Sequence, residues 1–188
     1  MEQGWEDRWK EFHRPVRAGG LWIGPPWVPP PAGELAVVVD PGRAFGTGAH
    51  ATTRACIELL DGVERGSLLD AGCGSGVVAV AAARLGFASV DAVDSDAVAV
   101  EVAAETARTN GVDLDVRRLD VLHDRLPVTD VAVANIELGA VERLLERLPA
   151  RIAVTSGYLA SEAPSAAGWL RVRRLELDGW AADVLETL

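Results

Sequence analysis

The segment 67–86 constrains the fold more than any other part of this sequence. The short apolar run 67–71 ends in the turn Gly72-Cys73-Gly74-Ser75-Gly76, and the nearly all-apolar stretch 77–85 follows, closed by Gly86. A strand that passes through a glycine turn into a helix is typical of an α/β sheet. A helix that lacks a polar face has to be buried. The sequence therefore predicts that helix 77–85 packs inside the protein against a sheet.

From residue 35 onward, apolar runs alternate with helical patterns, and short turns separate them. This alternation predicts an α/β, Rossmann-like fold with a mostly parallel sheet and helices on both faces. We expect the threonines at the start of the first helix to cap it, and Pro149 to end the last one. The tail predicts an antiparallel hairpin at a sheet edge, because Asp178-Gly179 joins two apolar runs. After a first apolar run at 35–39, the predicted strands are 67–71, 89–93, 114–119, 131–134 and 151–155, the helices 52–60, 77–85, 97–110 and 138–148, and the hairpin 169–177 with 180–185.

Residues 1–34 differ from the rest in composition, being rich in Trp, Gly and Pro. Trp5, Trp9 and Phe12 fall on one face of a short helix, and the prolines between residues 25 and 31 exclude regular helix or central strand. We therefore expect an N-terminal helix and extended arm, residues 1–34, before a single domain, residues 35–188. The aromatic face either packs on that domain or serves as a docking surface, and we favour packing.

Charge and cysteine content narrow the class of protein. Lys and Arg total 18 against 28 Asp and Glu, and residues 61–130 carry 13 acidic residues against 6 Arg. Nucleic acid is not expected as a direct partner, because phosphate binding needs a basic surface. Cys56 and Cys73 form no CxxC pair, which indicates a reduced compartment and no metal site. Without a signal-like N-terminus or a long apolar run, we expect a cytoplasmic protein with no membrane association.

The glycine turn predicts the ligand. Its spacing is GxGxG, and Val77 stands where the dinucleotide pattern has its third glycine, so the turn departs from the NAD type. Amides at a helix start favour a carboxylate, and Asp70 can face an ammonium group. Asp94 ends the next strand, where a carboxylate accepts ribose hydroxyls of either NAD or S-adenosylmethionine. The turn decides between them and favours S-adenosylmethionine.

Two more polar residues follow strands of the predicted sheet. Asp120 could meet an adenine amino group, and Asn135 follows the next strand. Either residue alone is as well explained as a turn cap, but with Gly72 and Gly74 at the same edge we favour ligand contact. His50 is a candidate base, although a histidine near a helix start is more often a structural hydrogen-bond partner.

The sequence also resembles the PrmA family, the methyltransferases of large-subunit ribosomal protein L11. Residues 40–53, DPGRAFGTGAHATT, carry the resemblance most clearly. It continues in 69–76 (LDAGCGSG), 94–96 (DSD), 134–136 (ANI) and 156–159 (SGYL), and in Trp9, Lys10, Phe12, Pro15 and 25–27 (PPW). It thus covers nearly the whole chain.

The resemblance implies a class I methyltransferase that uses S-adenosylmethionine, releases S-adenosylhomocysteine, and methylates lysine ε-amines and an N-terminal amine. The family's donor contacts fall on Thr53, Gly72, Asp94 and Asn135. Its loop of Phe45, Gly46, Thr47 and Gly48 would close over the donor.

Residue roles follow from the chemistry of transfer. Asn135 is our candidate for accepting a hydrogen bond from the incoming amine, although its NH₂ could instead hold the donor's carboxylate. Thr53 is either a cap or an orienting hydroxyl, and Phe45 packs either on the donor or on the core.

The chain also departs from the family pattern. The resemblance implies an additional N-terminal substrate-capture domain in the family, which we expect this chain to lack before Met1, and Ala49 and residues 137–139 differ from the commoner family pattern. We expect a protein substrate, most directly a ribosomal protein. The alternatives are a lysine of an electron-transfer flavoprotein subunit, a small-molecule amine, and a donor-binding module that does not catalyse transfer.

Overall fold

The computed structural model describes residues 13–42 and 46–188. The predicted aromatic helix face of Trp5, Trp9 and Phe12 lies outside the described residues, and so does Phe45.

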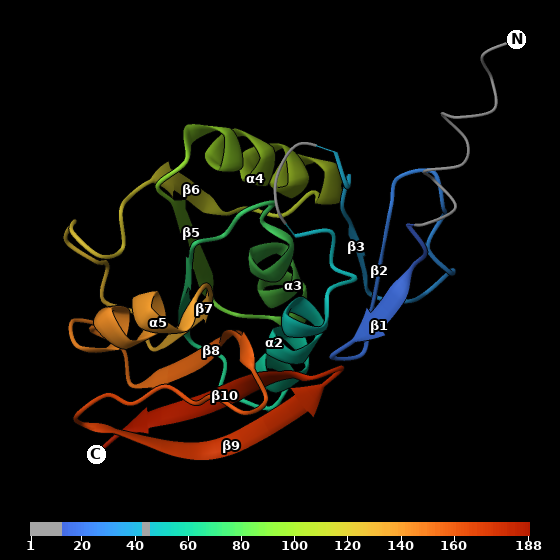
Figure 1. Ribbon diagram of the computed structural model, residues 1–188. Helices are drawn as coiled ribbons and strands as arrows, with labels where there is room; N and C mark the ends of the chain where they lie inside the picture. Colours follow the sequence, from blue (N-terminus) through green and yellow to red (C-terminus); the bar gives the residue numbers. More distant parts are fainter. Residues whose placement is uncertain (1–12, 43–45) are drawn as a thin grey trace, which may run out of the picture.

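A seven-stranded sheet forms the centre of the protein (Figure 1). Five strands run parallel, and the C-terminal hairpin extends the sheet antiparallel at one edge, as the sequence predicted. Asp178 and Gly179 join the hairpin strands with φ of 51° and 81°, the left-handed geometry of a two-residue hairpin turn. The strand order is β6 (Asp115–Arg118), β5 (Ser89–Asp94), β4 (Ser67–Ala71), β7 (Val131–Asn135), β8 (Ile152–Leu159), β10 (Trp180–Thr187) and β9 (Trp169–Leu177).

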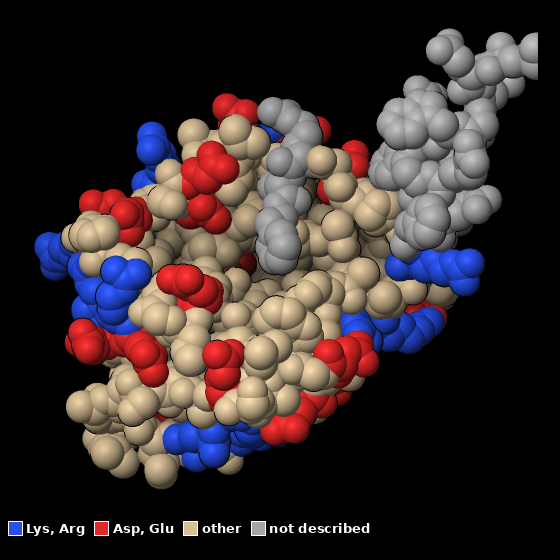
Figure 2. All heavy atoms as spheres, in the orientation of Figure 1, with Lys and Arg blue, Asp and Glu red and all other residues tan. Residues whose placement is uncertain are grey.

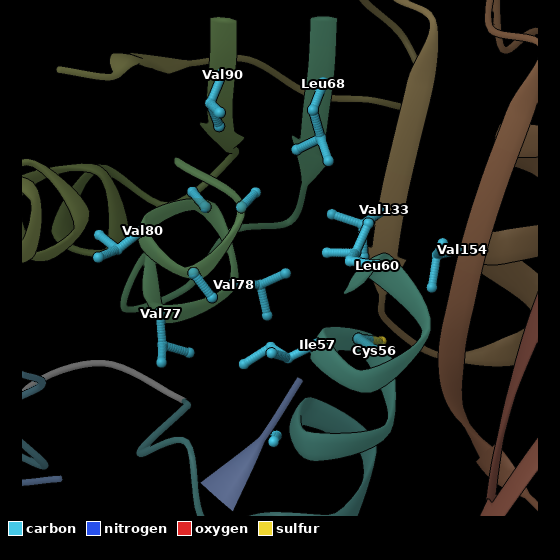
Figure 3. Close-up of a cluster of buried hydrophobic side chains, with 14 of the residues drawn as sticks. Cys56, Ile57, Leu60, Leu68, Val77, Val78, Val80, Val90, Val133 and Val154 are labelled. Carbon is cyan, nitrogen blue, oxygen red and sulfur yellow. The ribbon is translucent and has the colours of Figure 1, made fainter. Parts of the chain in front are cut away.

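Helices cover both faces of this sheet. On one face lie α2 (Ala51–Asp61), α3 (Val77–Leu85) and α4 (Ala97–Asn110), and on the other lies α5 (Leu138–Leu145). Alternation along β4 supplies both cores, since Leu68 belongs to the first and Leu69 to the second. Six residues of α3, Val77–Ala82, are buried, as predicted for a helix without a polar face. Figure 3 shows side chains of α2 and α3 meeting those of the strands: Ile57, Leu60, Val77, Val78, Leu68, Val133 and Val154.

A second, small sheet lies beside α2 and α3 (Figure 1). It consists of β1 (Val16–Ala18), β2 (Leu21–Gly24) and β3 (Ala36–Val38), and the sequence indicated only the apolar run 35–39 around the last of them. This run forms no strand of the main sheet, because β3 pairs in parallel with β2. Leu21, Ile23 and Val37 are fully buried in the first core, so this pairing buries apolar surface that a free arm would expose. The boundary expected between the arm (1–34) and the domain (35–188) therefore falls between two strands of one sheet, β2 and β3.

Two predicted helix ends were also wrong. Thr52 and Thr53 do not cap α2, because they lie inside its first turn. His50 is the N-cap, with extended backbone and Nδ1 accepting from Thr52 N. The last helix was predicted to reach residue 148, but α5 ends at Leu145, four residues before Pro149. A proline ring clashes with the carbonyl four residues earlier, which explains why the helix stops there.

Candidate functional site

The glycine turn between β4 and α3 lies at the carboxyl edge of the parallel strands, where α/β sheets bind ligands. Gly72, Gly74 and Gly76 all have left-handed φ, of 80°, 53° and 78°. A Cβ on Gly76 would lie 2.9 Å from Cα of Ala103, so glycine there allows α3 and α4 to pack closely. Left-handed φ at these three positions favours glycine. The amides of Gly72 and Cys73 donate to the Val93 carbonyl, and that of Gly76 donates to the Cys73 carbonyl.

Asp70, the fourth residue of β4, is buried beneath this turn at 3% exposure, and its Oδ2 has no hydrogen-bond partner. Burial raises the pKa of this carboxyl to about 7; the Asp94 carboxylate adds to the increase, and the Ala79 amide opposes it. An unpaired buried carboxylate oxygen costs free energy that a cationic ligand group would recover.

A narrow hollow opens above Asp70. Its volume is about 30 Å³, room for one or two water-sized groups, so a larger ligand would extend beyond it along the strand ends. Burial keeps the pKa of the Cys73 thiol well above its usual value, so this lining thiol is not a nucleophile. Figure 2 shows Asp and Glu interspersed with Lys and Arg over the face drawn there. The hollow is lined by Gly46, Thr53, Asp70, Gly72, Cys73, Gly74, Val77, Val78 and Asn135.

Thr53 and Asn135, the two predicted catalytic residues, meet across this hollow. Thr53 lies in the first turn of α2 and is buried, and Asn135 is the last residue of β7. Asn135 Nδ2 donates to Thr53 Oγ1 at 3.4 Å. With the amide in this orientation, Oδ1 remains available to accept a hydrogen bond from a ligand.

Asp94 borders the glycine turn from the end of β5. Its Oδ2 accepts from Gly74 N and its Oδ1 from Asp96 N, each at 3.0 Å. A carboxylate has about four acceptor positions, so two remain for ligand hydroxyls. The neighbouring Asp96 carries the N-cap role for α4, with Oδ1 accepting from Val98 N.

Two other predicted donor contacts lie apart from the hollow. Thr47 Oγ1 accepts from Ala49 N at 3.4 Å, and Thr47 lines a separate small cavity. Asp120 is engaged within its own turn, accepting from Leu122 N at 2.9 Å and pairing with His123 Nδ1 at 2.8 Å. Hydrogen bonds from the His123 side chain and the Leu122 amide lower the pKa of Asp120.

The structure also shows contacts at Gly157 and His50 that the sequence did not predict. Gly157 in β8 has φ of 103°, and a Cβ there would lie 2.0 Å from the carbonyl oxygen of Ile136. Its close approach supports the turn that follows Asn135. The sequence feature that could have predicted this contact is a glycine within a strand, which often marks a close approach of two backbones. His50, considered as a base, caps α2 and packs edge-to-face on Trp180, with ring centroids 5.1 Å apart.

A larger cavity, of about 360 Å³, lies between α4 and the chain around Val38 and Asp40, and no predicted site residue lines it.

Within residues 13–42 and 46–188, no cluster of three His, Cys, Asp or Glu could hold a metal ion. In the same part of the chain, no helix has the length and apolar character needed to cross a membrane.

Comparison with known proteins relates this chain to one family. The family model described as ribosomal protein L11 methyltransferase (PrmA) matches residues 1–165. The ribosomal protein L11 methyltransferase of Symbiobacterium thermophilum is 41% identical over 197 residues, which cover 96% of this chain and 65% of that protein. That of Caldanaerobacter subterraneus is 37% identical, covering 85% of this chain and 54% of that protein. This chain thus spans less than two thirds of these relatives.

A solved structure shares the fold over almost its whole length. The ribosomal protein L11 methylase of Lactobacillus delbrueckii subsp. bulgaricus superposes with a TM-score of 0.81 at 25% identity, covering 93% of this chain and 99% of that chain. The Rossmann-like fold predicted from the sequence is therefore confirmed.

Proposed function

Since the chain belongs to the ribosomal protein L11 methyltransferase (PrmA) family, we propose that it is an S-adenosylmethionine-dependent protein N-methyltransferase. Its acceptors are lysine or N-terminal amines, in the first place those of a large-subunit ribosomal protein. The observation that carries the proposal is the Thr53 to Asn135 hydrogen bond across a hollow whose floor holds the unpaired Asp70.

The residues of the site fit this donor. Asp70 offers a buried carboxylate oxygen without a partner to the donor's ammonium group. The amides at the start of α3 suit its carboxylate, and Asp94 has acceptor positions left for ribose hydroxyls. When bound, S-adenosylmethionine supplies a methyl group activated by a positively charged sulfur, and S-adenosylhomocysteine is the product. Gly72 and Gly74 allow the turn to approach this ligand closely. For Phe45 and Thr47 the role of donor contacts is a proposal from the family resemblance, and for Asp120 it is a proposal from its place after a strand of the sheet.

The chain's own catalytic task is to receive and orient an amine. A lysine amine has a pKa of about 10.4 in water and must lose a proton before it can attack. Asn135 Oδ1 accepts a hydrogen bond from the neutral amine and directs its lone pair, and Thr53 fixes the amide that does so. Holding the reactants in line supplies most of the rate gain in such a transfer.

Charge supports a basic protein as the acceptor. The chain has a formal charge of −10, which attracts a lysine-rich surface and repels nucleic acid. The relatives' names specify ribosomal protein L11, and we propose a protein of this kind, methylated in the cytoplasm. A lysine of another protein and a small-molecule amine are the alternative acceptors.

The test is transfer of labelled methyl from S-adenosylmethionine to purified ribosomal protein L11 and, in parallel, to a cell extract resolved into proteins and small molecules. We expect one labelled ribosomal protein band. Asp94→Ala is the matched control: it should bind no donor by calorimetry and still unfold cooperatively, at a lower Tm because the Gly74 and Asp96 amides lose their acceptor. If the label appears in another protein, or only in metabolites, the acceptor is a different one from ribosomal protein L11. If the protein binds the donor but transfers no methyl group, it is a donor-binding module and not an enzyme.

A further inference from the structure

Ser75 stands in the middle of the glycine turn, yet it is absent from the lining of the hollow. It is almost fully buried, at 1% exposure. Its Oγ instead donates a hydrogen bond of 2.5 Å to the carbonyl oxygen of Gly46. This bond joins two segments that are 29 residues apart and that both contribute walls to the donor hollow.

Gly46 is seated tightly against the glycine turn. Its φ is 104°, and a Cβ at this position would lie 3.1 Å from Ser75 Oγ and 3.7 Å from Cγ1 of Val77. Gly48, two residues later, would bring a Cβ to 2.5 Å from Cγ2 of Ile23. The backbone at residues 46–48 therefore fits into a slot between the start of α3 and strand β2, and the Ser75 hydroxyl is the polar contact within this slot.

We propose that Ser75 is a positioning residue for the methyl donor. It holds the Gly46 wall against the glycine turn, so that the donor meets a hollow with both walls already in place. Without the hydroxyl, the Gly46 carbonyl loses a buried hydrogen bond. Part of the free energy of donor binding is then spent on ordering the Gly46 wall, so the affinity for the donor falls. The inference rests on the proposed function, because it presumes that the hollow binds S-adenosylmethionine.

The test compares Ser75→Ala with Ser75→Thr, which keeps the hydroxyl. The donor Kd of each protein is measured by calorimetry, whose stoichiometry counts the folded sites, and KM and kcat are measured by methyl transfer. We expect Ser75→Ala to raise the donor Kd and KM about tenfold with kcat changed less than twofold, and Ser75→Thr to restore most of the affinity. In Ser75→Ala, hydrogen exchange at the amides of residues 46–48 should also become faster.

Ser67→Ala is the matched control, because Ser67 starts the same strand β4 at the opposite edge of the sheet. Its hydroxyl donates to Asp130 Oδ2 at 2.8 Å and accepts from Asp130 N at 2.9 Å. Losing it should lower stability while the donor Kd stays unchanged, which separates positioning from a general loss of stability.

Several results would overturn the inference. A wild-type donor Kd in Ser75→Ala would do so, and so would a fall in kcat at unchanged Kd, because the hydroxyl would then act in transfer. A tenfold weaker Kd in Ser67→Ala as well would reduce the effect to stability. If the wild-type protein binds the donor but transfers no methyl group, the proposed function fails while the Ser75 comparison still stands. If it binds no donor, both fail.

Discussion

At the scale of single residues, Asp70 has the strongest conflict between its chemistry and its surroundings. It lies in a β-strand with apolar neighbours, where an apolar side chain would be more stable, and its Oδ2 has no partner. Asp183, the other fully buried carboxylate among the described residues, differs because Tyr158 donates to it at 3.0 Å and Arg174 pairs with it at 3.3 Å. An unpaired group of this kind indicates a binding role more than a structural one.

Asp70→Asn should change how stability depends on pH. The pKa of Asp70 is raised to about 7 in the folded protein, whereas in the unfolded chain it is about 4. Between these values the folded state binds more protons, so wild-type stability falls as pH rises from about 4 to 7. Asn has no such proton, so the free energy of unfolding of the variant minus that of the wild type should increase over this range, by at most about 1.4 kcal/mol per pH unit.

Urea unfolding of both proteins at pH 5, 6, 7 and 8 measures this difference. Asp183 also has a raised pKa, caused mainly by burial, but it is present in both proteins and cancels in the comparison. A difference that stays constant with pH would show that Asp70 is ionised throughout.

Asn135→Ala should slow methyl transfer much more than it lowers stability. Removing a polar group that stabilises a transition state costs about a hundredfold in rate, whereas loss of a 3.4 Å hydrogen bond to Thr53 costs about 1 kcal/mol of folding. Single-turnover transfer and thermal unfolding measure the two effects separately. A near-normal rate would make Asn135 a turn residue.

At the scale of elements, the ends of parallel strands assemble the site, and neighbouring strands support them. The turn after β7 carries Asn135 and Ile136, and Gly157 of β8 lets that turn come close. Gly72 touches the same turn from the other side, since a Cβ on it would lie 2.7 Å from Cγ2 of Ile136. The position of Asn135 thus depends on contacts from two neighbouring strands.

Gly157→Ala should destabilise the protein strongly. The added Cβ would lie 2.0 Å from the Ile136 carbonyl oxygen, and the left-handed φ of 103° adds strain. Gly168→Ala is the matched control, with φ of 83° and nothing within 4 Å of its Cβ. We expect a loss of about 1–2 kcal/mol at Gly168 and more than about 4 kcal/mol at Gly157, measured by urea unfolding. Equal losses would mean that only backbone strain matters and that the turn after β7 adapts.

At the scale of the whole molecule, net charge governs encounters with a partner. The chain carries ten more acidic than basic side chains. A net charge of this kind speeds the approach of a basic protein at low salt.

The second-order rate of transfer to a basic protein acceptor should therefore fall severalfold as NaCl rises from about 50 to 300 mM, because the Debye length shortens from about 14 to 6 Å. The kcat of transfer, measured at saturating acceptor, should change little. A flat salt profile for kcat/KM would show that steering by the negative net charge plays no part.

Local chemistry determined much of this protein. The spacing of apolar residues and the positions of glycine and proline were enough to predict the five parallel strands, the buried α3 and the Asp178-Gly179 hairpin. Each of these depends on residues that are close in the chain. The shared location of the glycine turn, Asp70 and Asp94 could be predicted for the same reason, since strand ends gather at one edge of a parallel sheet; that they bind the donor stays a prediction. The helix ends were missed by a few residues, because His50 competes with the threonines as a cap.

Tertiary packing decided the rest. Which strand β3 would join depended on burial of Leu21 and Ile23, which come before it in the chain and gave no strand pattern of their own. Thr53 and Asn135 meet although 82 residues separate them, and Ser75 reaches Gly46 across 29. The burial that raises the pKa of Asp70 comes from helices and strands distant in the chain. Pairings and burial of this kind depend on the simultaneous packing of distant elements, and no local pattern encodes them.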